Sequence, residues 1–244
     1  MNRRKFLGGL GSLSAGLILS DRFRAGGLSF TQSKSLSAFG GKREHREISA
    51  VEDLMREHGV LRRILFVYSE AAAKLRNSDG PALLENLHKA AGLFRSFGEE
   101  YHEKKLEEAY IFPTVKKLRG EAAIYPDILT IQHNRGREIT DYILAATRGA
   151  GPDVGGTEKL AQVMESMVRM YRAHAAREDT VVFPAWKDAL SDEQLDEMSE
   201  KFEQIEHRQF GTNGFENAVQ QIAAIETELG LADLSQFTAE PITK

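Results

Sequence analysis

Two segments of the sequence place a histidine a few residues before a pair of acids and end on a Phe-Pro dipeptide. Each segment follows a stretch with one isolated histidine, and the intervals from the isolated to the paired histidine are similar, 44 and 41 residues. The two copies supply six candidate metal ligands: His58, His102, Glu107, His133, His174 and Glu178. Two halves that each offer two histidines and a carboxylate are what a four-helix bundle needs to hold two metal ions at its centre.

The residues around the histidines have the spacing of amphipathic helices. From about 48 to 76, apolar residues and His58 recur at intervals that alternate between four and three, which predicts a helix with His58 on its buried seam. A histidine on such a seam loses its water and needs a partner, and neutral imidazole is the commonest metal ligand in proteins. A single seam histidine is more often an ordinary core residue, but four of them on four successive helices favour a metal site.

The second copy positions its carboxylate well. His174 and Glu178 are four residues apart, so both side chains leave the same face of one helix, in line with the apolar stripe before them. A glutamate on that stripe is a buried charge that costs several kcal/mol unless it is paired or bound to metal. A dinuclear site removes this cost for the histidines and glutamates together. Asp179, five residues after His174, is the alternative ligand, but the stripe favours Glu178.

The first copy fits less well. Glu107 lies five residues after His102, which turns it about 140° away from the histidine on an ideal helix. One solution is a one-residue π-bulge between Lys104 and Glu107, a feature that is frequent at functional sites. The other is that Glu103 joins the site directly. We prefer Glu107 as the bridging carboxylate, because its distance to the Phe-Pro dipeptide equals that of Glu178 in the second copy.

The rest of the chain after residue 47 also reads as helix, and strand alternation is scarce. We expect the four bundle helices to be separated at three places: around 77–80, at Gly120 and around 149–152. Ser191 and Gln194 form a capping-box pattern for a fifth helix that ends at Gly211, and a sixth helix spans about 214–229. The predicted fold class is therefore all-α, a four-helix bundle with two additional C-terminal helices that pack along it.

The first residues have the pattern of a targeting signal. Arg3 and Arg4 precede an apolar stretch, 7–19, that is rich in glycine and serine and is too short and too weakly apolar for a confident membrane span. The pattern resembles a bacterial twin-arginine signal, whose pathway exports folded proteins, so we expect a periplasmic location. We divide the chain into a signal and linker, the bundle and the C-terminal extension: 1–46, 47–190 and 191–244.

Composition excludes several classes of site. The chain has no cysteine, which rules out disulfides, thiolate zinc sites and cysteine nucleophiles, so any metal must be held by nitrogen and oxygen. The formal net charge is −4 with both signs interspersed, and no basic stripe after residue 50 indicates a nucleic-acid partner. Nitrogen and carboxylate ligands suit iron or manganese, and zinc would fit without redox chemistry.

Four other residues are expected outside the ligand set. His88 lies fourteen residues before His102, about 21 Å along a helix, which is too far for one metal centre. His207 is expected on the surface, and Tyr101 and Tyr171 in the core or around the ligands. No nucleotide-binding loop or serine-nucleophile motif occurs in the sequence.

The ordered set of ligands resembles the haemerythrin-like, or HHE cation-binding, domain over about residues 48–190. The two E-[ED]-x-x-x-F-P tails strengthen the resemblance. It implies an up-down four-helix bundle around a non-haem diiron centre, with the four histidines as ligands and Glu107 and Glu178 bridging the irons. The chain departs from the family in the extra residue between His102 and Glu107. It also has Arg137 where the oxygen-carrying members have a second histidine, which argues against reversible oxygen carriage.

From the resemblance we expect two non-haem iron ions as the cofactor, favoured over manganese or zinc. The expected function is to bind or sense O2 or a related small oxidant, such as peroxide or nitric oxide. One alternative is a diiron enzyme of the peroxidase, oxidase or nitric-oxide-handling type, and another is an iron storage or scavenging protein. The sequence leaves open whether the protein is an enzyme.

Overall fold

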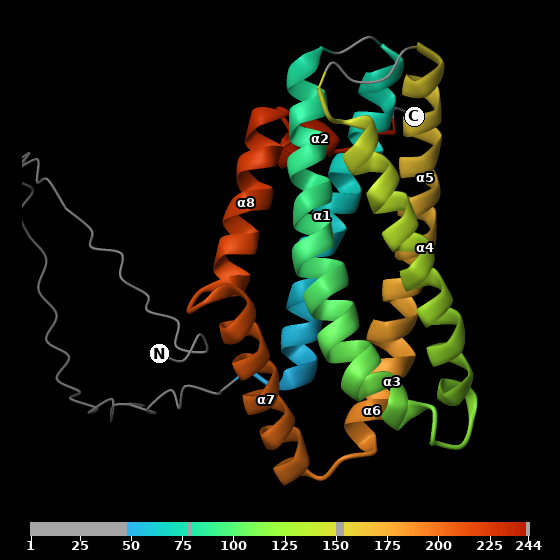
Figure 1. Cartoon of the computed structure of the whole chain (residues 1–244), viewed down its shortest axis with the longest axis vertical. Coiled ribbons are helices and arrows are strands. Elements are labelled where there is room, and N and C mark those ends of the chain that lie inside the picture. The colour runs from blue at the N-terminus through green and yellow to red at the C-terminus, as the bar shows by residue number, and fades with distance from the viewer. Residues whose placement is uncertain (1–47, 78–79, 150–153, 243–244) are drawn as a thin grey trace, which may run out of the picture. The chain divides into compact units, whose positions relative to one another are not determined.

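The computed structural model describes residues 48–77, 80–149 and 154–242, and it confirms the all-α fold. Four helical rods lie side by side, and each runs opposite to the one before it in the chain (Figure 1). No strand occurs in these three ranges, and none of their helices is long and apolar enough to cross a membrane. The predicted signal and linker, 1–46, lie outside the described residues.

Each rod is one helix or a short series of helices that continue one another. The first rod is α1 (Ala50–Arg76). The second consists of α2 (Pro81–Leu93), the π-helix η1 (Phe94–Ile111) and α3 (Phe112–Val115). The third consists of the 3-10 turn η2 (Glu121–Ile124) and α4 (Tyr125–Ala146). The fourth consists of α5 (Val154–Arg177), the π-helix η3 (Glu178–Val182) and α6 (Phe183–Asp188).

Local sequence signals account for several helix ends. The Ser49 side chain accepts a hydrogen bond from the backbone N–H of Glu52 and caps α1. Both hydrogen bonds of the capping box predicted for Ser191 and Gln194 are present at the start of α7 (Asp192–Phe210). Gly211 ends α7 with φ of 78°, a conformation that costs glycine little because it has no Cβ. These signals position the two C-terminal helices that the sequence predicts.

The C-terminal extension lies along one side of the bundle, where α7 and then α8 (Gly214–Glu228) follow one another (Figure 1). The 3-10 turn η4 (Leu234–Phe237) comes after them. The backbone N–H of Ala50 donates to Oγ of Ser199 over 2.9 Å, which ties the start of α1 to α7. Nε of Arg63 donates to Oε1 of Glu226 over 2.9 Å, which ties α1 to α8. The extension therefore packs on the first rod, and it also contacts the second.

The interior of the bundle combines an apolar core with a layer of buried histidines and acids. Tyr68, Phe94 and Leu87 are fully covered, as is usual for large side chains on helix seams. All six predicted ligands are also buried, although histidine and glutamate are rarely buried without a partner. The fold thus places polar groups at its centre, where they must be satisfied locally.

Candidate metal centre

The structure brings the six predicted ligands together from all four rods. None of them is more than 3 % exposed. The contributions are His58 from α1, His102 and Glu107 from η1, His133 from α4, and His174 and Glu178 from α5 and η3. Their ligand atoms form two groups of metal-binding geometry that share Glu107. This arrangement is compatible with bound metal ions.

Glu107 lies between the two groups and directs one carboxylate oxygen to each. Its Oε1 is 3.3 Å from Nε2 of His102 and 4.0 Å from Nε2 of His58. Its Oε2 is 3.4 Å from Nε2 of His133. Ligand atoms that each lie about 2 Å from one ion are separated by about 3 Å, so these distances suit a carboxylate that bridges two ions.

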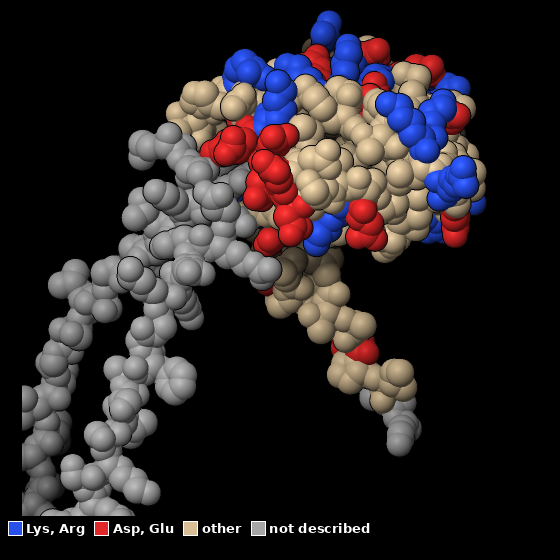
Figure 2. Space-filling view, turned by 90° about the horizontal axis from the view of Figure 1, so that it is seen from below, with Lys and Arg blue, Asp and Glu red and all other residues tan. Residues whose placement is uncertain are grey.

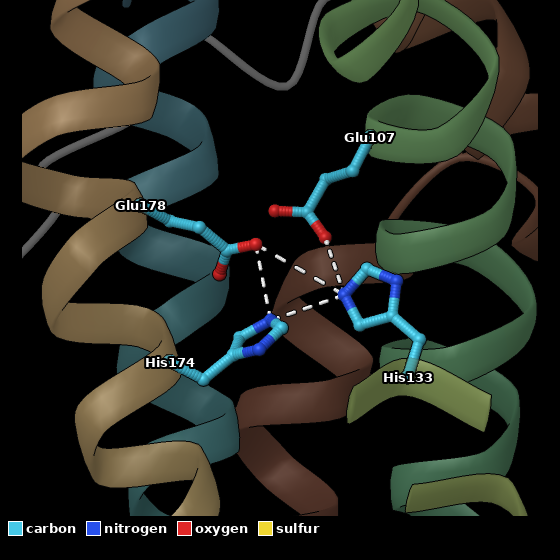
Figure 3. Close-up of side chains that lie close together, drawn as sticks. All are labelled: Glu107, His133, His174 and Glu178. Carbon is cyan, nitrogen blue, oxygen red and sulfur yellow. Dashed lines mark hydrogen bonds and ion pairs between the residues drawn. The ribbon is translucent and has the colours of Figure 1, made fainter. Parts of the chain in front are cut away.

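Glu178 makes the same arrangement from the opposite side (Figure 3). Its Oε1 is 3.0 Å from Nε2 of His174 and 4.0 Å from Nε2 of His133, while its Oε2 is 3.4 Å from Nε2 of His58. The Nε2 atoms of His133 and His174 are only 3.0 Å apart. Two imidazole nitrogens at this distance need a shared proton or a shared cation between them.

The inner atoms of the cluster lack the hydrogen bonds that buried polar atoms normally have. Within the described chain, neither carboxylate oxygen of Glu107 or of Glu178 has a hydrogen-bond partner, and Nε2 of His102 has none. An unsatisfied buried polar group costs about 1–3 kcal/mol, and more if it is charged. Several such atoms lie close together here, and bound cations would satisfy them. The residues present therefore fit a dinuclear metal site.

The buried carboxylates of the cluster require positive charge beside them. Burial lowers the pKa of His102, but the carboxylates of Glu107 and Glu57 outweigh burial and raise this pKa well above its usual value. Burial raises the pKa of Glu107, but His102 and His133 outweigh it and hold this pKa well below its usual range. The buried carboxylates therefore stay ionised and need positive charge beside them, which protons or metal ions supply in competition.

The second acid of each predicted E-[ED] pair holds a histidine of the other copy. Nδ1 of His58 lies 2.7 Å from Oδ1 of Asp179, and Nδ1 of His133 lies 2.9 Å from Oε1 of Glu108. A carboxylate on Nδ1 fixes the ring so that Nε2 faces the metal, and it raises the basicity of the ligand. Glu178, rather than Asp179, therefore points to the inner cluster, in agreement with the stripe in the sequence.

The phenylalanine of each Phe-Pro dipeptide packs on the same histidine that the acid holds. The ring centroid of Phe112 is 5.4 Å from that of His133, and the centroid of Phe183 is 5.3 Å from that of His58. The E-[ED]-x-x-x-F-P tail thus has a geometric explanation. Its first acid faces the metal cluster, and its second acid and its phenylalanine fix the isolated histidine of the opposite copy.

Two residues that hold the paired histidines are absent from the sequence prediction. Nδ1 of His102 lies 2.8 Å from Oε2 of Glu57, and Nδ1 of His174 lies 2.8 Å from Oε1 of Gln132. Both partners directly precede the isolated histidine of their own copy. Their matching positions in the two copies are the signal that could have identified them, and each takes part in orienting a ligand.

The π-helix η1 explains how Glu107 reaches the cluster. Hydrogen bonds from residue i to i+5 widen the helix turn, so residues five apart, such as His102 and Glu107, lie on one face. A π-helical segment is therefore the correct alternative, although it runs from Phe94 to Ile111 and is not a single bulge. Glu103 is buried nearby, but its Oε1 accepts a hydrogen bond from the Tyr171 hydroxyl over 2.7 Å. Its Oε2 lies 4.0 Å from Nδ1 of His133, which is the outer nitrogen of that ring.

Arg137 neutralises acids outside the ligand set. Its Nη2 lies 2.6 Å from Oε1 of Glu108 and 3.2 Å from Oε2 of Glu103. Glu103, Glu108 and His133 could by themselves hold a cation, and the guanidinium supplies that charge. Arg62 plays the same part in the other copy, where it pairs with Asp179.

The remaining candidates lie where the sequence places them, outside the ligand set. Nδ1 of His88 bonds to Oγ1 of Thr147, and His207 is exposed. Tyr101 and Tyr171 are buried, and their hydroxyls donate to acids around the ligands rather than to the ligands themselves. Gly136 makes room for Tyr171, because a Cβ at this glycine would lie 2.1 Å from the tyrosine oxygen.

Comparison with known proteins decides the family. The model of the Hemerythrin HHE cation binding domain matches residues 49–151 and again residues 125–240. The chain belongs to this family. Membership implies that the chain binds a metal cation, typically iron, and the buried cluster is compatible with that role. The overlapping matches of the haemerythrin model each contain one of the two E-[ED]-x-x-x-F-P tails.

Relatives of this haemerythrin domain are uncharacterized proteins of Mycobacterium bovis and of two strains of Mycobacterium tuberculosis. Each is 47 % identical over 195 residues, which is 78 % of this chain and 74 % of the relative. No solved structure matches the chain. The comparisons therefore establish the family, and the chemistry at the centre has to be argued from the residues.

Proposed function

We propose that the protein is a diiron protein that binds a small oxidant, such as O2, peroxide or nitric oxide. The observation that carries this proposal is the position of the two inner carboxylates. Glu107 and Glu178 each direct one oxygen to the His58–His102 side and one to the His133–His174 side. Two such carboxylates suit a pair of ions with nitrogen and oxygen ligands, and this ligand set suits iron.

A small cavity lies at the cluster itself, because five of the six inner ligands line it. Its volume is about 10 Å³, and its walls include Leu61, Leu65 and Ala175 as well as inner ligands. This is room for about one water-sized molecule. Arg62 is the one exposed residue of the lining, so it marks the route between the cavity and solvent. The enclosed site therefore leaves little room beside the ions, which favours a small ligand over an organic substrate.

When bound, a pair of ferrous ions would supply the electrons and the open coordination position that such an oxidant needs. The chain's own residues would do the rest. Asp179 and Glu108 hold the histidine rings in place, the apolar walls limit water, and the outer arginines balance charge. These roles serve binding equally well in a carrier, a sensor or an enzyme.

One observation favours the enzymatic alternative. The Tyr171 side chain lines the cavity, and its hydroxyl donates to Glu103, which in turn faces Arg137. Burial and the Glu103 carboxylate raise the pKa of Tyr171 well above its usual value, so the hydroxyl keeps its proton. A hydroxyl beside the ligand can accept a hydrogen bond from a peroxide and hold it in place, and reduction of the peroxide consumes two protons and two electrons.

Metal content tests the proposal directly. Elemental analysis of protein purified without a chelator should find two iron ions per chain, and His174→Ala should lose at least one of them. His88→Ala is the matched control, because His88 is bonded to Thr147 away from the cluster, and it should retain both. If His174→Ala keeps both ions, the ligand assignment is wrong. More than two ions per chain would instead support iron storage.

Binding and catalysis separate in a second experiment. Anaerobic diferrous protein is mixed with limiting O2 or peroxide, and its absorption spectrum is followed with and without a reductant. A stable and reversible spectrum supports binding, whereas rapid turnover with the reductant supports an enzyme. Tyr171→Phe should slow turnover but leave metal binding intact if the hydroxyl positions the peroxide.

We also propose export to the periplasm, which is supported by the Arg3-Arg4 pair and the weakly apolar stretch after it. Export in the folded state would let the protein carry its metals from the cytoplasm. Cell fractionation of an epitope-tagged chain tests this. Replacement of both arginines by lysine should keep the protein in the cytoplasm, and an unchanged periplasmic fraction would contradict the proposal.

A further inference from the structure

An open cleft with basic walls lies between η1 and α7. Its volume is about 700 Å³, and it is lined by Lys104, Lys105 and Tyr110 of η1 and by Arg208 of α7. Glu100 is the single acid among its lining residues. The cleft is on the second rod, which also carries two of the six inner ligands, and the lysines are only a few residues from His102 in the sequence.

The charge of this cleft contrasts with the rest of the domain. Residues 1–47 contain nine Lys and Arg but only three Asp and Glu, so the net charge of −4 for the whole chain leaves −10 for the remainder. Acidic side chains gather at the end of the bundle on the side of α7 (Figure 2). The first turns of α7 supply five exposed acids: Asp192, Glu193, Asp196, Glu197 and Glu200. A group of three cations on such a domain is therefore a distinct local feature.

The cations of the cleft are available to a partner. Lys104 and Arg208 are exposed, and neither forms an ion pair with another residue in the described part of the chain. Lys105 donates to the amide oxygen of Gln209 and not to a carboxylate. Cations on a protein surface are commonly offset by neighbouring acids, so a group that keeps its charge produces a local positive potential.

A continuous path of packed groups leads from the edge of this cleft to a candidate ligand. Phe210 follows Gln209 of the cleft, and its ring centroid is 5.3 Å from that of Tyr101. The Tyr101 hydroxyl donates to Oε1 of Glu57 over 2.8 Å. Oε2 of Glu57 then lies 2.8 Å from Nδ1 of His102. The second copy has Gln132 in place of Glu57, and Tyr171 bonds to Glu103 instead.

We propose that the cleft docks a small one-electron carrier protein with an acidic face, and that its electrons reach the metal centre along the path from Phe210 to His102. This inference rests on the enzymatic alternative of the proposed function, because a diiron centre that reduces an oxidant has to be reduced again. Two docking events deliver two electrons, and the carrier is oxidised twice. With two protons, these electrons convert one peroxide to two water molecules.

The charges favour a protein over other occupants. Exposed lysines hold a single small anion weakly, because each interaction is made in water. Several together steer and orient a charged protein face. The N-terminal segment 1–47 is net basic, so the same charges repel it. The net acidic remainder of the domain disfavours an acidic carrier elsewhere, so docking at the cleft is favoured.

Docking is measured on the full chain as purified, whatever its metal content, with a plant-type [2Fe–2S] ferredoxin as the acidic probe. Titration at low ionic strength gives a Kd for the native chain and for a double variant, Lys104→Glu with Arg208→Glu. We expect the variant to bind at least about tenfold more weakly. The matched control is Lys159→Glu with Arg169→Glu, which makes the same charge change at exposed residues of α5. It should bind like the native chain.

Two docking results overturn the proposal: no measurable binding of ferredoxin, or equal weakening by the test and control variants. Because docking does not require iron, these results are independent of the metal analysis that tests the proposed function. If the chain contains no iron, that function fails even where docking succeeds.

Electron transfer is measured by stopped flow on the iron-loaded chain. Tyr101→Phe keeps the ring but removes the hydrogen bond to Glu57, so it should slow reduction by ferredoxin several-fold without a change in Kd. An unchanged rate would overturn the path. Ascorbate, a small anionic reductant, provides a further comparison. If the Lys104→Glu, Arg208→Glu variant is reduced more slowly by ascorbate to the same extent as by ferredoxin, the occupant is a small anion and the protein partner is overturned.

Discussion

The two halves of the bundle present the same inner ligands in different surroundings. The first half, α1 with η1, and the second half, α4 with α5 and η3, each contribute two histidines and one carboxylate. In both halves an arginine follows the isolated histidine by four residues and pairs with the acid that holds it. The residue before that histidine differs, however, because Glu57 of the first half is replaced by Gln132 in the second.

The halves also differ in how they fill the space next to the ligands. In the first half, a Cβ at Gly98 would lie 3.0 Å from a methyl carbon of Leu61. In the second half the arrangement is reversed. The glycine, Gly136, is on the rod with the isolated histidine, and the large residue that lies against it, Tyr171, is on the rod with the paired histidine. This exchange brings a hydroxyl group into the cavity wall on one side only.

These differences show that the ligands and their environment are separate features of the fold. The inner set is repeated, so each ion would have two histidines and one oxygen from each of the two carboxylates. The two sides differ in the partners of Nδ1, because His102 bonds to the acid Glu57 and His174 bonds to the neutral Gln132. The other outer charges are matched, since Glu103 lies 4.0 Å from Nδ1 of His133 on the second side. A carboxylate on Nδ1 makes an imidazole a stronger donor. We therefore expect the ion on the His102 side to be oxidised more easily.

The largest expected effect is the loss of a group that both halves share. Glu107→Ala removes one oxygen from each ion site, so both metal equivalents should be lost, whereas His102→Ala should mainly affect one. Glu103→Ala is the control, since Glu103 is equally buried on η1 but bonds to Tyr171 and Arg137. Elemental analysis distinguishes these outcomes. Two retained ions in Glu107→Ala would show that the carboxylate does not bridge.

The exchange of large and small residues predicts unequal costs for the same substitution. Gly136→Ala would place a Cβ 2.1 Å from the Tyr171 oxygen, so the tyrosine must move and lose its bond to Glu103. We expect destabilisation of about 1–3 kcal/mol, the usual cost of overpacking. Gly98→Ala meets only the flexible end of Leu61 at 3.0 Å and should cost less. Denaturant unfolding of both variants checks this, and equal costs would contradict the asymmetry.

The charge difference between the halves predicts opposite shifts of reduction potential. Glu57→Gln should raise the potential of the ion at His102, and Gln132→Glu should lower that of the ion at His174. The exchanged side chains have nearly the same shape, so packing should be preserved. Redox titration followed by Mössbauer spectroscopy measures the two ions separately. Shifts of the same sign in both variants would refute the proposed origin of the inequivalence.

An expected effect that disappears toward low pH concerns Glu99, which lies three residues before His102 and has no acidic counterpart in the second half, where Tyr171 stands. Burial raises the pKa of Glu99 to about 7, despite a hydrogen bond from Thr140 and the nearby Arg95. The folded state therefore holds a proton that the unfolded state releases near pH 4.5. Stability falls as pH rises from about 4.5 to about 7 and is then level with respect to this group.

Glu99→Gln should remove this dependence. The variant should be more stable than the native chain by about 1–3 kcal/mol at pH 8, and the difference should shrink toward pH 5. Urea unfolding at both pH values gives the comparison. A difference that is the same at pH 5 and pH 8 would mean that Glu99 titrates normally in the folded protein.

Periodicity along the chain was sufficient to predict much of this protein. The seam that contains His58 predicts which face of α1 is buried, and the spacing of His174 and Glu178 predicts that they share a face, because a helix repeats every three to four residues. The tails after Glu107 and Glu178 identify the two copies. The export signal, the identity of the metal and the role of the ligands stay predictions.

The tertiary structure decided which groups meet across the bundle. That Asp179 holds His58 and Glu108 holds His133 depends on the register of rods that are far apart in sequence, and no local spacing encodes it. The inward direction of Glu107 depends on i to i+5 hydrogen bonds, which are rare in helices and are stable here because the surrounding rods fix them. Helix faces follow from local backbone geometry, whereas partners across rods follow from how those faces pack.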